Sequence, residues 1–324
     1  MGARVVLLVT SPRLPAGLLT ADAWDTLRAH PVYAASASGD QVTALRAAGV
    51  AVTEASGADA LLAAAAEHGT VVWLAGPAGD QDLAREIGLR VAREPALAEL
   101  ELMYGSWDPP GARVLDAVAV MDRLASPGGD PWKREQTHQS LAHFLIEETY
   151  EAYDAIIEGD LDALREELGD LLLQVVLHAR MAEDRADGEP WSIDDVAGDL
   201  TAKMIRRNPH VFGDATVADV GEIIQSWERI KREEKSRQSA MDGIALSQPA
   251  LALAAKILMR AERAGIPVTV PAPSADGAFE GEEALGAALL AMVAEARAHH
   301  LDAEAALRRA ALAYAQAVRS TERS

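Results

Sequence analysis

The spacing of hydrophobic residues changes along the chain and separates two kinds of structure. Before residue 95, short apolar runs alternate with alanine-rich stretches of helical character near 21–29, 40–48 and 57–67. The apolar runs lie at 5–9, 50–53 and 71–74. Strands of this length that alternate with helices are typical of a small parallel sheet. We therefore predict a small α/β domain over residues 1–95.

The remainder of the chain has the pattern of long helices. Residues 96–113 contain Pro109, Pro110 and Gly111 and are predicted to be a linker. Helical spacing then predicts a helical bundle over 114–264, a Pro- and Gly-rich linker over 265–281 and a helical tail over 282–324. The expected fold is mainly α, a helical bundle preceded by a small α/β domain. Helices are expected near 114–124, 137–157, 161–183, 193–207, 218–239 and 249–264.

Composition and charge limit the classes of function. The 324 residues are 49% apolar and 25% charged, which is ordinary for a soluble protein, and the absence of cysteine excludes thiol and zinc–thiolate chemistry. A net charge of −20 argues against general binding of nucleic acid. It leaves room for a small phosphate-bearing substrate held by local cations. Without an apolar span or leader pattern, we expect a cytoplasmic protein that does not bind membranes.

An acid-rich segment at 147–170 holds the clearest candidate chemistry. It contains ten acidic side chains and one basic one, Arg165. Most such segments are solvated charged faces. Here, however, Glu148 falls on the apolar stripe of its helix and Glu151 borders it, and acids on such a stripe are costly unless their charge is compensated. The stripe is formed by Leu141, Phe144, Leu145, Ala152 and Ile156.

The position of Gly159 predicts how these acids meet. A tight turn at Gly159 makes an antiparallel hairpin in which residues whose numbers sum to 318 face each other. Glu151 then opposes Glu167, and Glu148 opposes Asp170, each helix offering its pair at i, i+3 on one face. This register selects Glu148 rather than Glu147 as the inward acid.

Four facing carboxylates need protons or cations. Two carboxylates about 4 Å apart repel by roughly 4 kcal/mol at an effective dielectric of about 20. Hard oxygen ligands favour Mg²⁺ or Mn²⁺ over zinc. A di-iron bundle would require Glu-x-x-His on two helices, and that spacing occurs once, at Glu135 and His138, outside the hairpin. The hairpin therefore predicts a magnesium site.

Cations that suit a polyphosphate follow downstream. Lys203, Arg206 and Arg207 lie at i, i+3 and i+4, and Trp227 and Lys231 share a helical face at i, i+4. Each cation alone is more often a solvated surface residue. Their occurrence together with a metal cage makes them candidate substrate-binding residues.

Two further candidates precede the acidic helix. Trp132 is able to stack on a nucleobase and Gln136 to hydrogen-bond to one. Trp132 is equally well explained as a core residue that caps the bundle.

Taken together, these motifs resemble the MazG family of nucleoside triphosphate pyrophosphohydrolases. The resemblance covers residues 114–262. It is carried by Asp130-Pro-Trp-Lys-Arg-Glu-Gln-Thr137, Glu147-Glu-Thr-Tyr-Glu151, Glu166-Glu-Leu-Gly-Asp170, Lys203-Met-Ile-Arg-Arg-Asn-Pro-His-Val-Phe212 and Trp227-Glu-Arg-Ile-Lys231.

The resemblance implies an all-α domain that hydrolyses a nucleoside triphosphate to the monophosphate and pyrophosphate with Mg²⁺, or Mn²⁺ in its place. It implies that water attacks the α-phosphorus and that the protein is a homodimer or a higher homo-oligomer. By the family's motif, Glu147 is an accessory catalytic acid. The implied metal ligands are Glu148, Glu151, Glu167 and Asp170. The implied phosphate-binding and nucleotide-binding residues are Lys203, Arg207, Lys231 and Trp227.

The chain departs from the family pattern at both ends. Shifted by 117 positions, the segment from Glu166 aligns with the segment from Glu283, where alanines at 284 and 287 replace two of the acids. The tail at 282–324 is therefore interpreted as a degenerate second copy of the helical domain. Residues 1–95 are interpreted as a remnant of the tetrapyrrole-methylase-like domain that precedes the helical domain in some relatives.

Three hypotheses of function remain open from the sequence. The first is an enzyme that clears non-standard or damaged nucleoside triphosphates, and the second is an enzyme specific for one nucleotide, such as a deoxypyrimidine. The third is a catalytically inactive helical regulatory or scaffold protein that binds nucleotide or a protein partner. The intact carboxylates at all four positions favour the enzymes.

Overall fold

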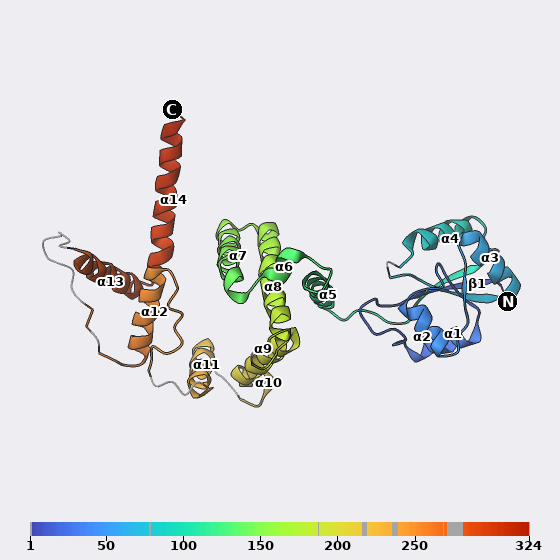
Figure 1. Cartoon of the computed structure of the whole chain (residues 1–324), viewed down its shortest axis with the longest axis horizontal. Helices are drawn as coiled ribbons and strands as arrows, with labels where there is room; N and C mark the ends of the chain where they lie inside the picture. The colour runs from blue at the N-terminus through green and yellow to red at the C-terminus, as the bar shows by residue number, and fades with distance from the viewer. Residues whose placement is uncertain are drawn as a thin grey trace. The chain divides into compact units, whose positions relative to one another are not determined.

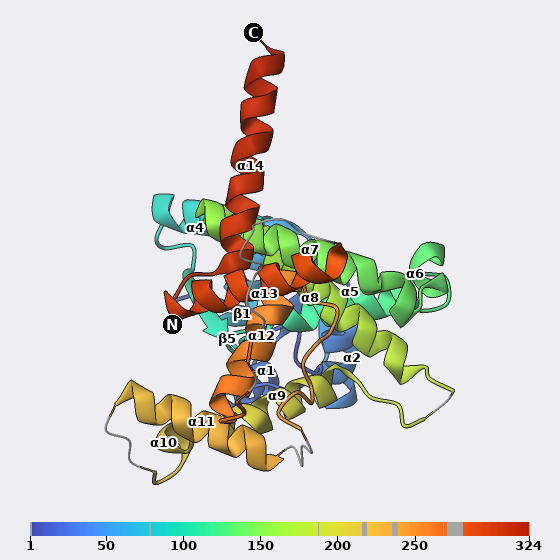
Figure 2. The same cartoon turned by 90° about the vertical axis from the view of Figure 1, so that its left-hand side faces the viewer.

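The structure is a computed structural model that describes residues 2–77, 79–186, 188–215, 219–234, 239–267, 269–270 and 281–323. The chain divides into two compact units, Met1–Asp199 and Leu200–Ser324. Figures 1 and 2 show that helices dominate the chain after residue 112, whereas the preceding part contains a sheet.

The first unit begins with a five-stranded parallel sheet of order β3-β2-β4-β1-β5. The central strands β1 and β4 are almost continuously apolar and buried because helices cover both faces of the sheet. The strands are β1 (Arg4–Val9), β2 (Val32–Ala34), β3 (Val52–Glu54), β4 (Thr70–Leu74) and β5 (Glu99–Tyr104).

Four helices form the two outer layers of this α/β domain. Leu27 and Leu45 belong to the core under one face, and Leu61 and Ile87 to the core under the other. The first face is covered by α1 (Ala21–Ala29) and α2 (Asp40–Ala47), and the second by α3 (Gly57–His68) and α4 (Gln81–Arg93). The predicted α/β class of this region is confirmed.

The predicted linker over 96–113 is wrong in its first half. Strand β5 lies there and pairs with β1 along its full length, so the sheet extends past residue 95 to Tyr104. The run Glu-Leu-Glu-Leu alternates polar and apolar residues, as an edge strand does, but its proline-rich neighbours hide the signal. Strand β2, which has three residues, is also absent from the predicted elements.

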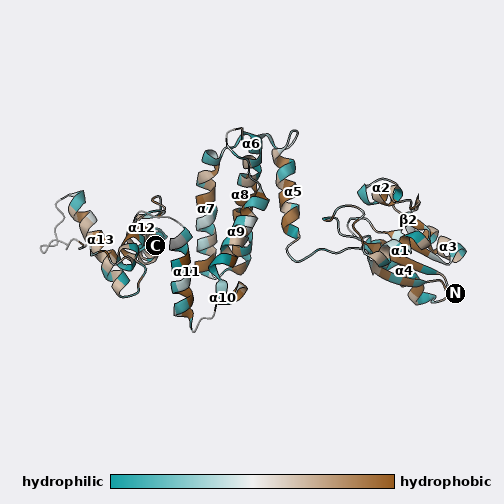
Figure 3. Cartoon of the chain, turned by 90° about the horizontal axis from the view of Figure 1, so that it is seen from below, coloured by the Kyte–Doolittle hydropathy of each residue, from teal (hydrophilic) through white to brown (hydrophobic). Residues whose placement is uncertain are grey.

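The helical part of the first unit is built around a hairpin of α7 and α8, against which α5 packs. Met121, Leu141, Val176 and Leu177 form its buried core. Figure 3 shows hydrophobic and hydrophilic residues on different parts of these helices, as expected for amphipathic elements. The helices are α5 (Arg113–Ala125), α6 (Pro131–Glu135), α7 (His138–Glu158), α8 (Leu161–Glu183) and α9 (Ile193–Arg207), the last of which continues into the second unit.

The described secondary-structure elements of the second unit are all helices, and α12 packs with both α13 and α14. The predicted helix over 218–239 is described from Val220 to Glu234, and residues 218 and 235–238 lie outside the described residues. The helices are α10 (Pro209–Phe212), α11 (Val220–Glu234), α12 (Ala250–Arg263), α13 (Glu282–Ala298) and α14 (Ala303–Glu322).

The C-terminal part is predicted to be a linker over 265–281 followed by a helical tail over 282–324. Most of the predicted linker, residues 268 and 271–280, lies outside the described residues. The predicted helical tail is two helices, separated at residues 299–302, where His300 has a φ of 57° that interrupts the helix. Among the described residues, no helix is both long and apolar enough to cross a bilayer.

Candidate active site

The turn between α7 and α8 fixes how the acidic residues face each other. Gly159 ends α7 with a φ of 73°, in the left-handed region where glycine pays no steric penalty. Asp160 then begins α8, its side chain accepting hydrogen bonds from the amides of Asp162 and Ala163 at 3.0 Å each. The hairpin therefore reverses at the position that the sequence predicts.

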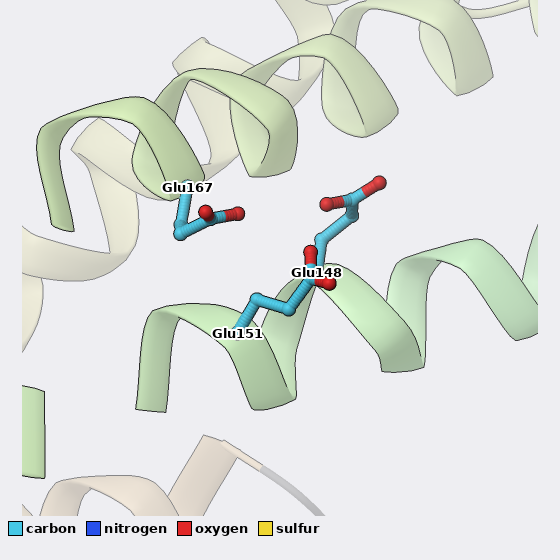
Figure 4. A group of neighbouring side chains, drawn as sticks. All are labelled: Glu148, Glu151 and Glu167. Atoms are coloured by element: carbon cyan, nitrogen blue, oxygen red, sulfur yellow. The ribbon is translucent and has the colours of Figure 1, made fainter. Parts of the chain in front are cut away.

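Three of the predicted acids converge in the space between the two helices. Glu148 and Glu151 extend from α7 and Glu167 from α8 (Figure 4), and one carboxylate oxygen of each lies within 4.8 Å of the others. Glu148 and Glu167 are half-buried, whereas Glu151 is exposed. Together they present several hard oxygen atoms to one small volume.

The electrostatics of this group oppose full ionisation. The pKa of Glu148 is raised first by loss of solvent and then by the charges of Asp170 and Glu151. The pKa of Glu167 is raised first by loss of solvent and then by the charges of Glu151 and Asp170. Asp170 is thus close enough to act on both glutamates, although the three converging oxygens belong to the others. We call Glu148, Glu151, Glu167 and Asp170 the carboxylate cage.

Glu147 differs from its neighbour Glu148 in its surroundings. One residue corresponds to a rotation of about 100° around a helix. Glu147 is accordingly exposed and does not belong to the group of converging oxygens. The structure thus agrees with the register that points Glu148, rather than Glu147, toward α8.

The two candidates before α7 are held by local contacts. Trp132 is 49% exposed and meets the Phe144 ring edge-on, with centroids 6.0 Å apart. The Gln136 amide nitrogen donates to the Trp132 carbonyl at 2.9 Å, and its oxygen accepts from the Ser140 hydroxyl at 2.7 Å. Trp132 therefore keeps an exposed surface, whereas Gln136 joins α6 to the start of α7.

Within the second unit, two of the predicted cations bind one carboxylate, Glu234, which is not among the predicted site residues. Arg207 is 8% exposed and donates to Glu234 through Nε at 3.1 Å and Nη2 at 2.6 Å. Arg206 Nε donates to the same carboxylate at 2.6 Å. Hydrogen bonds from Arg207 and then Arg206 lower the pKa of Glu234 to about 2. Glu234 therefore binds α11 to the end of α9.

Trp227 lies beside two of these cations. The Arg207 guanidinium carbon is 5.0 Å from the centroid of the Trp227 ring, and the Lys231 ammonium is 4.7 Å from it. Lys203, four residues before Arg207 on α9, is half-buried in the same unit. The structure thus brings four of the predicted residues together here: Arg206, Arg207, Trp227 and Lys231.

The spacing of residues on α11 gives a signal for Glu234 in the sequence. Trp227, Lys231 and Glu234 follow one another at i, i+4 and i+7, which places all three on one face of α11. The burial of Arg207 needs a paired carboxylate, but which acid provides it depends on how α9 and α11 pack. We call Arg206, Arg207 and Glu234 the arginine clamp.

The fold and the cage place the protein in a helical class. In this class a helical hairpin brings together carboxylates that suit a hard divalent cation. The family model described as the MazG nucleotide pyrophosphohydrolase domain matches residues 136–212. This range contains the whole carboxylate cage together with Lys203, Arg206 and Arg207.

Individual relatives extend the likeness beyond this domain. An "uncharacterized 26.1 kDa protein in blaB 3' region" of Streptomyces cacaoi is 49% identical over 227 residues, covering 70% of this chain and 89% of that protein. A nucleoside triphosphate pyrophosphohydrolase of Escherichia coli K12 is 37% identical, covering 64% of this chain and 86% of that protein. The chain belongs to the MazG family of nucleoside triphosphate pyrophosphohydrolases.

A mycobacterial relative shows how coverage varies. The nucleoside triphosphate pyrophosphohydrolase of Mycobacterium tuberculosis is 51% identical over 157 residues, which are 48% of this chain. The match spans about half of that relative's length, 47%. As a member of this family, the chain is an enzyme of the nucleoside triphosphate pyrophosphohydrolase class.

Proposed function

We propose that the enzyme hydrolyses nucleoside triphosphates at the α-phosphorus, with Mg²⁺, to the nucleoside monophosphate and pyrophosphate. The observation that carries this proposal is the convergence of Glu148, Glu151 and Glu167 across the α7–α8 hairpin, with the charge of Asp170 acting on two of them. Acids in this arrangement repel one another in the free protein. A bound cation would remove that repulsion and gain oxygen ligands.

The donor set fits Mg²⁺, and Mn²⁺ as its substitute. All four residues of the cage offer hard oxygen atoms, and one oxygen of each of three lies within 4.8 Å of the others. Glu148, Glu151, Glu167 and Asp170 would hold the ion. When bound, such an ion polarises phosphate oxygens and favours deprotonation of water.

The protein's own residues would orient the substrate and the attacking water. In the metal-free protein the pKa of Glu148 and of Glu167 is raised by loss of solvent and by the neighbouring acids, and a bound cation would oppose this rise. We assign Glu147, exposed on α7, to an accessory role as a second acid near the reacting water. Proton removal from the attacking water by a carboxylate outside the metal ligands, such as Glu147, would generate the nucleophile that attacks the α-phosphorus.

Substrate binding is assigned by the shared motifs and the chemistry of the side chains. Lys203, Arg207 and Lys231 would bind phosphates, and Trp227 would contact the nucleotide. Arg206 contributes positive charge beside Arg207, and Glu234 accepts hydrogen bonds from both guanidinium groups. The exposed part of Trp132 would contact the base. The side-chain amide of Gln136, which donates to the backbone carbonyl of Trp132, would hold Trp132 in place.

The proposed role is removal of non-standard or damaged nucleoside triphosphates in the cytoplasm, by a homodimer or higher homo-oligomer. Hydrolysis at the α-phosphorus suits this role because it leaves a monophosphate that polymerases cannot incorporate. The net charge of −20 favours small substrates over nucleic acid, whose binding requires a basic surface.

The test is to incubate the full chain with standard and damaged nucleoside triphosphates in ¹⁸O-labelled water, with Mg²⁺ or with EDTA. We expect pyrophosphate release with Mg²⁺ only, and ¹⁸O in the monophosphate. Release of inorganic phosphate instead, or label in pyrophosphate, would contradict attack at the α-phosphorus. No turnover of any substrate with Mg²⁺ or Mn²⁺ would favour a nucleotide-binding protein without chemistry.

A further inference from the structure

The α/β domain contains a cavity of about 410 Å³ at one end of its sheet. Its walls come from the segment that follows β1, beginning at Thr10, and from the last residues of β2 and β4, Ala34 and Leu74, with the segments that follow them. All three strands are parallel, so the cavity lies at their carboxyl ends. A volume of this size falls within the usual range for sites that bind small molecules.

The strand order explains why a cavity forms at this place. Strands β2 and β4 are neighbours, but the chain leaves β2 toward β3 through α2 and leaves β4 toward β5 through α4. Helices α2 and α4 cover opposite faces of the sheet. The two connections therefore diverge and leave a crevice between them, and in open α/β sheets ligands bind at such a switch point.

The connections that line the cavity are held by specific hydrogen bonds. Gln41 accepts from the Gly17 amide at 2.9 Å, which joins the segment after β2 to the segment after β1. After β4, the Asp80 carboxylate accepts from the Trp73 indole at 2.8 Å and from the Gly76 amide at 3.0 Å. Asp80 itself has a φ of 45°, which is unusual for a residue other than glycine.

The first connection is held in addition by the start of the helical region. Arg13 donates to Asp116 of α5 through Nε at 2.8 Å and Nη2 at 2.6 Å, and also contacts Asp108. The buried Ser11 lines the cavity, and its hydroxyl donates to Asp108. The cavity wall is thus preformed rather than dependent on a ligand for its shape.

The lining residues indicate the chemistry of a ligand. Leu14, Leu74 and Pro77 offer apolar surface suited to the face of a ring, and Ser36, Ser38 and Asp40 offer hydroxyl and carboxylate groups. Among the described residues that line the cavity there is no Lys or Arg. An acidic residue after the second strand of an α/β sheet is suited to accept hydrogen bonds from ribose hydroxyls. Phosphate groups would meet a carboxylate without a compensating cation.

We propose that this cavity binds a nucleoside without phosphates, the ring against the apolar wall and the ribose hydroxyls at Asp40. The site belongs to the α/β domain and is separate from the carboxylate cage, whose residues belong to α7 and α8. The proposed ligand of the cavity is the nucleoside part of the triphosphates that the enzyme is proposed to hydrolyse. The proposal does not depend on the hydrolytic reaction.

The test is isothermal titration of the full chain with adenosine, guanosine, cytidine and uridine, and with the corresponding triphosphates in EDTA. We expect at least one nucleoside to bind at one site. Ala35→Phe, which fills the cavity, and Asp40→Asn, which removes the ribose acceptor, should each weaken binding about tenfold or more. The matched substitutions Ala47→Phe and Asp22→Asn, at exposed positions of α2 and α1 outside the cavity, should leave it unchanged.

Two results would overturn the proposal. One is failure of all four nucleosides to bind. The other is binding that survives both cavity substitutions but is lost in Trp227→Ala, which would place the nucleoside with the triphosphate-binding residues. Pyrophosphate release by Ala35→Phe and Asp40→Asn checks that the variants fold. An inactive wild-type chain that still binds a nucleoside at the cavity would contradict the hydrolytic function alone.

Discussion

Carboxylates stand in opposite electrostatic surroundings in the cage and in the arginine clamp. Glu148 and Glu167 are half-buried beside other acids, and their pKa values are raised, first by loss of solvent and then by those acids. Glu234 is also half-buried, but two arginines lower its pKa to about 2. The charge of Glu234 is compensated within the protein, whereas the charges of the cage repel one another, and a cation from solution would relieve that repulsion. An uncompensated group of like charges thus indicates a binding function more strongly than an acid-rich sequence does.

The largest effect should follow from breaking the cage. Glu167→Gln keeps the shape of the side chain but replaces a charged ligand oxygen with an amide. We expect pyrophosphate release to fall by at least about 100-fold, because catalysis by a bound metal depends on its ligands. The control is Glu158→Gln, an exposed acid at the end of the same hairpin and outside the cage. Near wild-type turnover by Glu167→Gln would contradict the role of the cage.

A smaller effect should follow from breaking the clamp. Glu234→Gln removes the charge that holds Arg206 and Arg207, and Arg207 then no longer keeps its place over Trp227. We expect KM for the triphosphate to rise about tenfold with little change in kcat, measured by pyrophosphate release.

The matched control for the clamp is Glu283→Gln, an exposed acid in the first turn of α13. A lower KM in Glu234→Gln would show that Glu234 competes with phosphate for the arginines. That outcome would contradict a positioning role.

The cage was predictable from the sequence because its geometry is local. Gly159 sets the turn, and helical periodicity then determines which acids face each other. The clamp was not predictable in the same way, since it depends on packing between α9 and α11. Strand β5 was missed because an edge strand exposes half of its residues and here adjoins a proline-rich segment. The cavity in the α/β domain depends on the strand order, which three recognised strands could not specify.

The cost of the cage should be visible in the stability of the metal-free protein. Glu148→Gln removes one of the repelling charges, so we expect the Tm in EDTA at pH 7 to rise by about 1–3 °C. Excess Mg²⁺ should raise the Tm of the wild type more than that of the variant. Differential scanning calorimetry measures both, with Glu158→Gln as the control. A lower Tm for Glu148→Gln in EDTA would mean that Glu148 is compensated in the free protein.

The smallest effect concerns the pH dependence of the clamp. The folded pKa of Glu234, about 2, lies below the ordinary value of 4.5, so its stabilising contribution is present above 4.5 and is lost as pH falls toward 2. The difference in unfolding free energy between wild type and Glu234→Gln should therefore be constant from pH 7 to about 5 and shrink below 4.5. Urea denaturation across this range measures it. A difference that grows on acidification would contradict the ion pairs.

The most direct test of the central claim is the binding of Mn²⁺, as a paramagnetic substitute for Mg²⁺, followed by electron paramagnetic resonance. The wild type should bind Mn²⁺ in competition with Mg²⁺. Glu151→Gln and Glu167→Gln should lose this binding, while Glu158→Gln keeps it. Equal Mn²⁺ binding by the wild type and both cage variants would show that the converging carboxylates are not the metal site.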